Sequence, residues 1–311
     1  MLLVEEVLAA TIRGATPLLL AALGELVSQR AGVINIGIEG MMLIGALSGM
    51  IGSFYTAGLP MFAPWIGLFA AGVSGLLMAI IFIIFAIKLR GDQIVIGTAL
   101  TLFALGFTEV INQRLLQVFG RSLKSTAFND IHLPVLSEIP IFGKVLFSQN
   151  IIVYLTFFLV PCVYIFLYHT HFGLRVRACG EHPNAISTVG SNVLLIRTAC
   201  MLLAGVLAGL GGGYLSLADV PYFNSEMTAG RGFIALTIVI FGKWHPIKTC
   251  GAALLFSFGF ALEYRFQAFG LAIQRQWFMM LPFLLCLAVL AGFVGRAEAP
   301  KALGKTFDPQ A

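Results

Sequence analysis

Long, uninterrupted apolar runs dominate the sequence and limit what the chain can fold into. A transmembrane helix needs about 20 mostly apolar residues, whereas a membrane β-barrel shows short segments of alternating polarity. The runs here are long and continuous, and only 11% of the 311 residues are charged. Soluble domains average about a quarter. We therefore expect an all-α, polytopic membrane protein in which residues 1–311 form a single transmembrane domain.

Nine apolar stretches are candidates for membrane spans. The seventh is too short to cross a membrane alone, which predicts a half-helix or a span that begins in the preceding loop. We therefore expect about nine to ten helices. The stretches lie at roughly 8–28, 36–57, 64–87, 93–113, 150–169, 197–217, 231–242, 249–268 and 276–294.

Two pairs of segments echo each other. "AGVSGLL" (71–77) is followed by "ALTLFALG" (99–106), and "AGVLAGL" (204–210) is followed by "ALTIVIFG" (235–242). If the spans alternate, the matched segments run in opposite directions. This pattern predicts an inverted repeat, an architecture common among transporters.

The basic residues of the short loops fall on one side of the membrane if the spans alternate. Lysines and arginines accumulate in cytoplasmic loops, so we assign that side, with a loop at about 173–196, to the cytoplasm. The other side carries a long loop at about 114–149. The net charge of +5 is explained by these loops and does not indicate nucleic-acid binding.

The sequence offers no constellation for catalysis or for a resident cofactor. It lacks the GxxxxGK[ST] pattern of a nucleotide-binding loop. The five cysteines have neither metal-ligand nor redox spacing, and the histidine pair of "HTH" (169–171) has no adjacent acidic or cysteine partner. We expect neither an enzyme nor a metal site.

Polar residues inside the spans are costly and by default indicate a substrate or ion path. In "RAGVINIGIEGMM" (30–42), Asn35 and Glu39 stand in an apolar segment with three glycines. Together with Gln93 and Asn112, they are our candidates for the translocation path or its gate. A structural ion pair or a hydrogen-bonded turn is an equally good interpretation of Glu39.

A short capped helix is predicted in the cytoplasmic loop. Pro183 suits a first helical position, Gly190 suits the residue after the last turn, and Ile186 and Val189 would share a face. Such a helix docks on a soluble partner or lies on the bilayer surface, and residue chemistry alone leaves both alternatives open.

Three sequence blocks carry a family resemblance. "GELVSQRAGVINIGIEGMMLIGAL" (24–47), "GEHPNA" (180–185) and "YFNSEMTAGRGFIALTIVIFGKWHP" (222–246) resemble permeases of bacterial ABC importers of the branched-chain amino acid/ribose class. They are most similar to the nucleoside and simple-sugar group, which works with basic membrane lipoproteins as binding proteins. The resemblance covers nearly the whole chain.

The resemblance implies a type II-like importer permease in the bacterial inner membrane that forms a path for nucleosides. It implies a second homologous permease, expected as a heterodimer, a cytoplasmic ATPase that binds ATP and Mg, and an extracytoplasmic substrate-binding lipoprotein. It also implies that the cytoplasmic loop is the coupling helix. The matching residues there are Gly180, Glu181, His182, Pro183, Asn184 and Ala185, with His182 at a variable position.

Two alternatives remain at this level. A simple-sugar permease of the ribose or galactose type would share the same motifs. An ion-coupled secondary transporter would use Glu39, Glu109 or Glu263 as its ion site, but it has no need of a docking helix in the cytoplasm.

Overall fold

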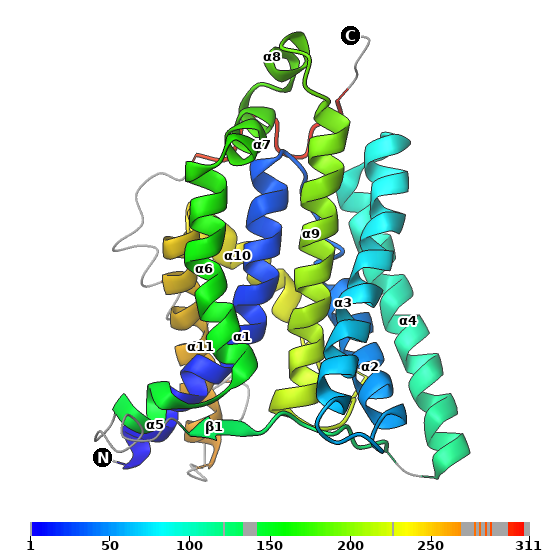
Figure 1. Cartoon of the computed structure of the whole chain (residues 1–311), viewed down its shortest axis with the longest axis vertical. Helices are drawn as coiled ribbons and strands as arrows, with labels where there is room; N and C mark the ends of the chain where they lie inside the picture. The colour runs from blue at the N-terminus through cyan, green and yellow to red at the C-terminus, as the bar shows by residue number, and fades with distance from the viewer. Residues whose placement is uncertain are drawn as a thin grey trace.

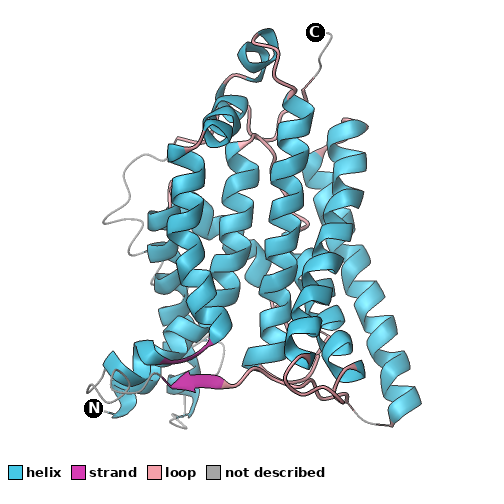
Figure 2. Ribbon diagram, in the orientation of Figure 1, coloured by secondary structure: helices cyan, strands magenta, loops and turns pink. Residues whose placement is uncertain are grey.

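The computed structural model describes residues 2–120, 122–132, 142–225, 227–268 and 298–307, with Trp277, Met280, Leu284 and Leu287. Within these residues the chain is a bundle of helices (Figure 1). The two strands, β1 (Asp130–His132) and β2 (Ser148–Asn150), form a small antiparallel pair below the bundle (Figure 2). The all-α expectation is confirmed.

Helices occupy eight of the nine predicted stretches. They are α1 (Leu2–Arg30), α2 (Ile38–Tyr55), α3 (Ala63–Phe82) with the π-helical η1 (Ile83–Lys88), α4 (Gln93–Phe119), α6 (Ile151–His169), α9 (Val193–Tyr214) with η3 (Leu215–Asp219), α10 (Arg231–Phe241) and α11 (Pro246–Ala268). Shorter helices connect them: α5 (Phe142–Phe147), α7 (His171–Glu181) and α8 (Pro183–Thr188). Of the ninth stretch, 276–294, the structure describes only Trp277, Met280, Leu284 and Leu287.

Six of these helices are long and apolar enough to cross a membrane. They are Val4–Arg30, Ile38–Tyr55, Ala63–Lys88, Gln93–Phe119, Ile151–His169 and Val193–Asp219. The seventh predicted stretch is the 11-residue helix α10. At 1.5 Å per residue it is about 16 Å long, half of a hydrocarbon core of about 30 Å, so the half-helix interpretation is the one the structure supports.

Helix α1 lies at the centre of the bundle and packs against α6, α9, α10 and α11. Its N-terminus lies at one end of the molecule, whereas α7, α8 and the segment 298–307 lie at the other (Figure 1). We call the latter the α8 end. The loop that joins α10 to α11 also reaches the α8 end, because Trp244 contacts Arg30 there. The predicted gathering of the basic loops on one side is therefore confirmed.

Glycines bring α2, α3 and α9 into backbone contact. A Cβ placed on Gly209 would lie 2.3 Å from the carbonyl oxygen of Ala71, and one on Gly75 would lie 2.1 Å from that of Gly205. A Cβ on Gly45 would lie 2.4 Å from the carbonyl oxygen of Gly209. Small residues allow membrane helices to approach closely, so "GLGGGYL" (209–215) is a packing motif here.

Replacing Gly209 with alanine is expected to destabilise the protein. Gly→Ala in a helix normally stabilises by up to about 1 kcal/mol, but here the methyl group meets backbone and overpacks the α3–α9 contact at a cost of about 1–3 kcal/mol. The matched control is Gly106→Ala in α4, where nothing lies within 4 Å of the added Cβ. Thermal unfolding in detergent should show a lower midpoint for Gly209→Ala only, and equal midpoints would contradict the packing account.

Candidate functional site

Residues 31–37 form a buried, non-helical stretch between α1 and α2. Backbone in an apolar interior must find its hydrogen bonds within the protein, and side chains supply them here. Glu25 Oε1 accepts from Asn35 N at 3.0 Å, and Gln93 Oε1 accepts from Ile34 N at 2.9 Å. Ser28 donates its hydroxyl to Val33 O. The polar residues of the opening motif therefore satisfy an irregular backbone inside the bundle.

Asn35 belongs to this stretch and Gln93 binds it from α4, and both side chains are buried. The Asn35 amide nitrogen contacts Met41 Sδ at 3.4 Å, and its Oδ1 has no hydrogen-bond partner among the described residues. The same is true of Glu25 Oε2. Glu25, an acidic residue near the end of the first apolar run, is completely buried.

Glu39, in the first turn of α2, caps the N-terminus of α10. Its Oε1 accepts from Gly230 N at 2.9 Å, and its Oε2 accepts from Gly232 N at 2.6 Å. The first N–H groups of a helix have no partners within the helix, and the helix dipole favours a carboxylate there. Gly232 lacks a Cβ for a direct reason, because one would lie 2.5 Å from Glu39 Cα.

A polar network fastens the other end of α10 to α1. Trp244 donates Nε1–H to Gln29 Oε1 at 2.6 Å, and Arg30 donates Nε–H to the Trp244 carbonyl at 2.9 Å. His245 packs beside two tyrosine rings, Tyr164 and Tyr168. Burial, with Lys248 and Arg30 nearby, lowers the pKa of His245, so its ring is neutral at pH 7. Both ends of α10 are thus bound to residues 29–39.

The loop after α6 folds as two short helices, α7 and α8, and α8 is the short helix that the sequence predicts. Pro183 is the first residue of α8, and Gly190 follows with a φ of +79°. His182 is the N-cap residue, but its side chain makes no capping hydrogen bond. Ile186 and Val189 do not share an environment: Ile186 packs against the core, whereas Val189 is 82% exposed.

Within "GEHPNA", Gly180 is the residue that contacts the rest of the molecule most closely. A Cβ there would lie 2.2 Å from the Arg30 carbonyl oxygen, so α7 meets the end of α1 without an intervening side chain. Glu181 and Pro183 are half-buried, and His182, Asn184 and Ala185 are exposed at the α8 end. These three positions lie on the surface of the α8 end.

A C-terminal strap, residues 300–307, binds α7 to the buried stretch. Ala302 donates its N–H to the Gly180 carbonyl at 2.8 Å, and Gly304 donates to the Gly32 carbonyl at 3.1 Å. Arg197 of α9 donates to Lys305 O at 2.8 Å. Sequence reasoning missed this strap, whose only local signal is buried apolar residues, Ala302 and Phe307, in an otherwise polar tail.

Asn112 lies apart from the other three path candidates. It donates its amide to Ser225 Oγ at 3.2 Å, in the loop that leads to α10. Asn35, Glu39 and Gln93 gather around residues 31–39, whereas Asn112 lies towards the other end of α4. No group of three or more potential metal ligands occurs in the part of the chain that the structure describes.

Removing the Glu39 carboxylate is expected to destabilise α10. Glu39→Gln keeps the size but leaves one buried N–H facing an amide NH2, at a cost of about 1–3 kcal/mol. Glu109→Gln is the control, since Glu109 interacts with the side chains of Gln113 and Ser225 and does not cap buried backbone N–H groups. Thermal unfolding should separate the two variants by several degrees. A Glu39→Gln midpoint equal to that of the control would exclude the cap.

Loosening the strap is expected to expose Cys179, which is fully buried and contacts Ala31 O at 3.4 Å. Burial raises the pKa of this thiol, so it should react slowly with maleimide at pH 7. In a variant that retains Cys179 as its only cysteine, Ala302→Pro deletes the N–H bonded to Gly180. Labelling should accelerate at least tenfold, while Lys301→Ala, which keeps every strap backbone bond, should label slowly. Equal rates would contradict the strap.

Comparison with known proteins finds relatives that are similar over most of their length. The guanosine ABC transporter permease protein NupQ of Bacillus subtilis is 39% identical over 304 residues, covering 95% of this chain and 94% of NupQ. The nucleoside ABC transporter permease protein NupC of Lactococcus lactis is 36% identical over 299 residues, covering 94% and 93%. The putative glucose ABC transporter permease protein TsgC13 of Haloferax volcanii is 36% identical over 270 residues, covering 85% and 79%. No solved structure matches the chain.

Residues 7–290 match the family described as branched-chain amino acid transport system / permease component. The match covers most of the chain, including all three blocks that carry the resemblance. The chain therefore belongs to this family, and it is an integral, multi-pass membrane permease, a transport component rather than an enzyme.

Proposed function

We propose that this chain is the permease subunit of an ATP-driven ABC importer and forms the translocation path for nucleosides across a bacterial inner membrane. The observation that carries the proposal is the end-to-end similarity to two nucleoside permeases, which extends over 94–95% of the chain. The glucose relative is similar over a shorter part, 85%. Nucleosides are therefore the first choice and simple sugars the second.

The proposed partners are a second homologous permease in a heterodimer, an ABC ATPase at the α8 end, and a lipoprotein that delivers substrate from the opposite side. ATP and Mg bind to the ATPase. The residues that would contact it are those of "GEHPNA" (180–185), and the exposure of His182, Asn184 and Ala185 supports this role. Val189, the exposed residue that follows α8, extends the surface.

Backbone contacts would transmit a movement of α8 to α10 at the centre of the bundle. Gly180 touches Arg30 and is bonded to the strap, and the strap is bonded to Gly32. Residues 31–37 then lead directly to Glu39, which holds α10. In this proposal α7, α8, the strap and α10 move as one body when ATP closes the ATPase, and access to the path alternates between the two sides.

Asn35, Glu39, Gln93 and Asn112 are proposed to act at the path or its gate. The first three would act through the shape of the buried stretch and the position of α10. Asn112 would act through the loop that precedes α10. The inverted repeat belongs to the same proposal. It is supported by α3 and α9, which run in opposite directions and each end in a π-helical turn.

Uptake by the reconstituted transporter tests this function. Proteoliposomes that contain both permeases, the ATPase and the binding lipoprotein should accumulate radiolabelled guanosine only when ATP is present. Ribose and glucose at the same concentration should not compete. Guanosine uptake driven by a proton gradient without ATP would overturn the proposal, and strong competition by glucose would reassign the substrate.

Ala185→Asp is expected to separate ATP hydrolysis from transport. Ala185 is exposed on α8, so a carboxylate there leaves the fold intact while it disturbs the docking surface. Uptake should fall at least tenfold while the thermal midpoint stays unchanged. Gln117→Asp, at the far end of α4, adds the same charge away from that surface and should transport normally. Normal uptake by Ala185→Asp would show that the ATPase docks elsewhere.

A further inference from the structure

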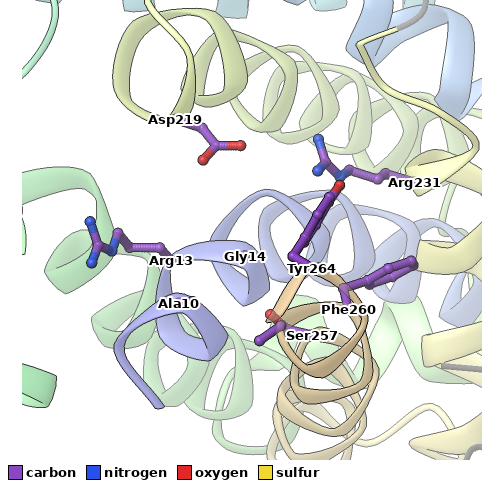
Figure 3. Close-up of a pocket in the computed structure, with 9 residues that line it drawn as sticks. Ala10, Arg13, Gly14, Asp219, Arg231, Ser257, Phe260 and Tyr264 are labelled. Carbon is purple, nitrogen blue, oxygen red and sulfur yellow. The ribbon is translucent and has the colours of Figure 1, made fainter. Parts of the chain in front are cut away.

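A pocket of about 260 Å³ lies where α1, η3, α10 and α11 meet (Figure 3). Its α1 residues belong to the N-terminal half of that helix, away from the α8 end (Figure 1). It continues into a second hollow of about 370 Å³ along the loop 220–227, and the two share Asp219, Arg231 and Tyr264. We call the first cavity the outer pocket. It is lined by Ala10, Arg13, Gly14, Asp219, Arg231, Ser257, Phe260, Ala261 and Tyr264.

The outer pocket reaches the middle of the bundle. Arg231 is the first residue of α10, and α10 rises only about 16 Å before it ends near Arg30 at the α8 end. Arg13 lies 17 positions before Arg30 on α1, about 26 Å along that helix. The lining therefore extends from mid-depth towards the end at which the proposed binding lipoprotein delivers substrate.

Small residues form one wall of the pocket and polar residues form its rim. Ala10, Gly14 and Ser257 come from α1 and α11, which pack so closely that a Cβ on Gly14 would lie 2.7 Å from Ser257 Oγ. Figure 3 shows Asp219 and Arg231 facing each other across the opening, with Tyr264 beside Arg231. No ion pair joins Asp219 to Arg13 or Arg231 among the described residues. Charges within membrane helices are costly unless they serve a function.

The rim offers three kinds of contact to a ligand. Asp219 carries two carboxylate oxygens that accept hydrogen bonds. Arg231 uses one N–H group for Met227 O at 3.1 Å, and a guanidinium has five N–H groups in all, so others remain available. Tyr264 is 58% exposed, and Phe260 adds a second aromatic ring. A neutral ligand with a flat aromatic part and a pair of hydroxyl groups matches this set.

We propose that the outer pocket is a nucleoside-binding subsite of the permease. Tyr264 stacks on the base, Asp219 accepts hydrogen bonds from the ribose 2′- and 3′-hydroxyls, and Arg231 donates to the carbonyl or ring-nitrogen acceptors of the base. The inference rests on the proposed function and adds to it the chemical groups of the substrate that the permease itself recognises.

The subsite includes a residue of the first turn of α10, the turn that Glu39 caps. Arg231 lies between Gly230 and Gly232, whose N–H groups both donate to Glu39. A nucleoside bonded to Arg231 therefore contacts the first turn of α10 directly. Occupancy of the pocket and the position of α10 are linked through one backbone turn.

Uptake of guanosine and 2′,3′-dideoxyguanosine by the complete transporter tests the role of Asp219. The ratio of their transport efficiencies (Vmax/KM) should favour guanosine in the wild type and fall roughly tenfold in Asp219→Asn, as expected for lost bonds to a charged acceptor. The binding lipoprotein is the same in both arms, so a changed ratio belongs to the permease. Guanosine monophosphate serves as competitor, and stronger competition by it than by guanosine would show an anion site and overturn the proposal.

A pair of substitutions at Tyr264 tests stacking. Tyr264→Leu removes the ring and should raise the apparent KM for guanosine several-fold, whereas Tyr264→Phe, which keeps the ring, should raise it much less. Tyr55→Leu is the matched control, because Tyr55 is 68% exposed at the end of α2 and does not line the pocket.

The results distinguish an error in the proposed subsite from an error in the proposed function. In one result, the wild type imports guanosine while Asp219→Asn keeps the wild-type ratio of transport efficiencies and Tyr264→Leu keeps the wild-type apparent KM. The subsite proposal is then wrong, and nucleoside import is still supported. If the wild type imports no nucleoside, both are wrong.

Discussion

The hydrogen bonds of residues 31–37 are the constraint on which the rest of the structure depends. Unpaired backbone groups inside a membrane protein cost several kcal/mol each, so a buried, non-helical stretch must be supplied with partners from its surroundings. Glu25, Ser28 and Gln93 supply them. The stretch in turn fixes where α2 begins, and hence where Glu39 meets the first turn of α10.

The three sequence blocks that resemble ABC importer permeases meet at this stretch. "GEHPNA" contacts the residue before the stretch, since Gly180 packs on Arg30. The third block contacts residues on both sides of the stretch, Glu39 through Gly232 and Gln29 through Trp244. Each contact uses either a glycine that allows backbone to approach or a polar side chain that satisfies backbone. The resemblance thus corresponds to a single connected region, which extends from the surface of α8 to mid-depth.

Much of this arrangement was predictable from the sequence. The rest was not predictable, because it depends on contacts between distant segments. Hydrophobic runs predicted where helices form, and Pro183 with Gly190 predicted α8, because these signals are local. Glu39 remained ambiguous between a path residue and a hydrogen-bonded turn, because its partners, Gly230 and Gly232, are about 190 positions away in sequence. The strap and the outer pocket were not predicted, since both assemble side chains and backbone from distant segments.

The central claim is that the strap, residues 31–39 and the start of α10 form one mechanical unit. Hydrogen–deuterium exchange on the purified protein tests it most directly, by comparing the wild type with Ala302→Pro. The account predicts that breaking the strap at Gly180 speeds exchange in peptides covering 31–39 and 228–236 by a similar factor, while α4 exchanges as before. Faster exchange confined to the strap, with 228–236 unchanged, would contradict it.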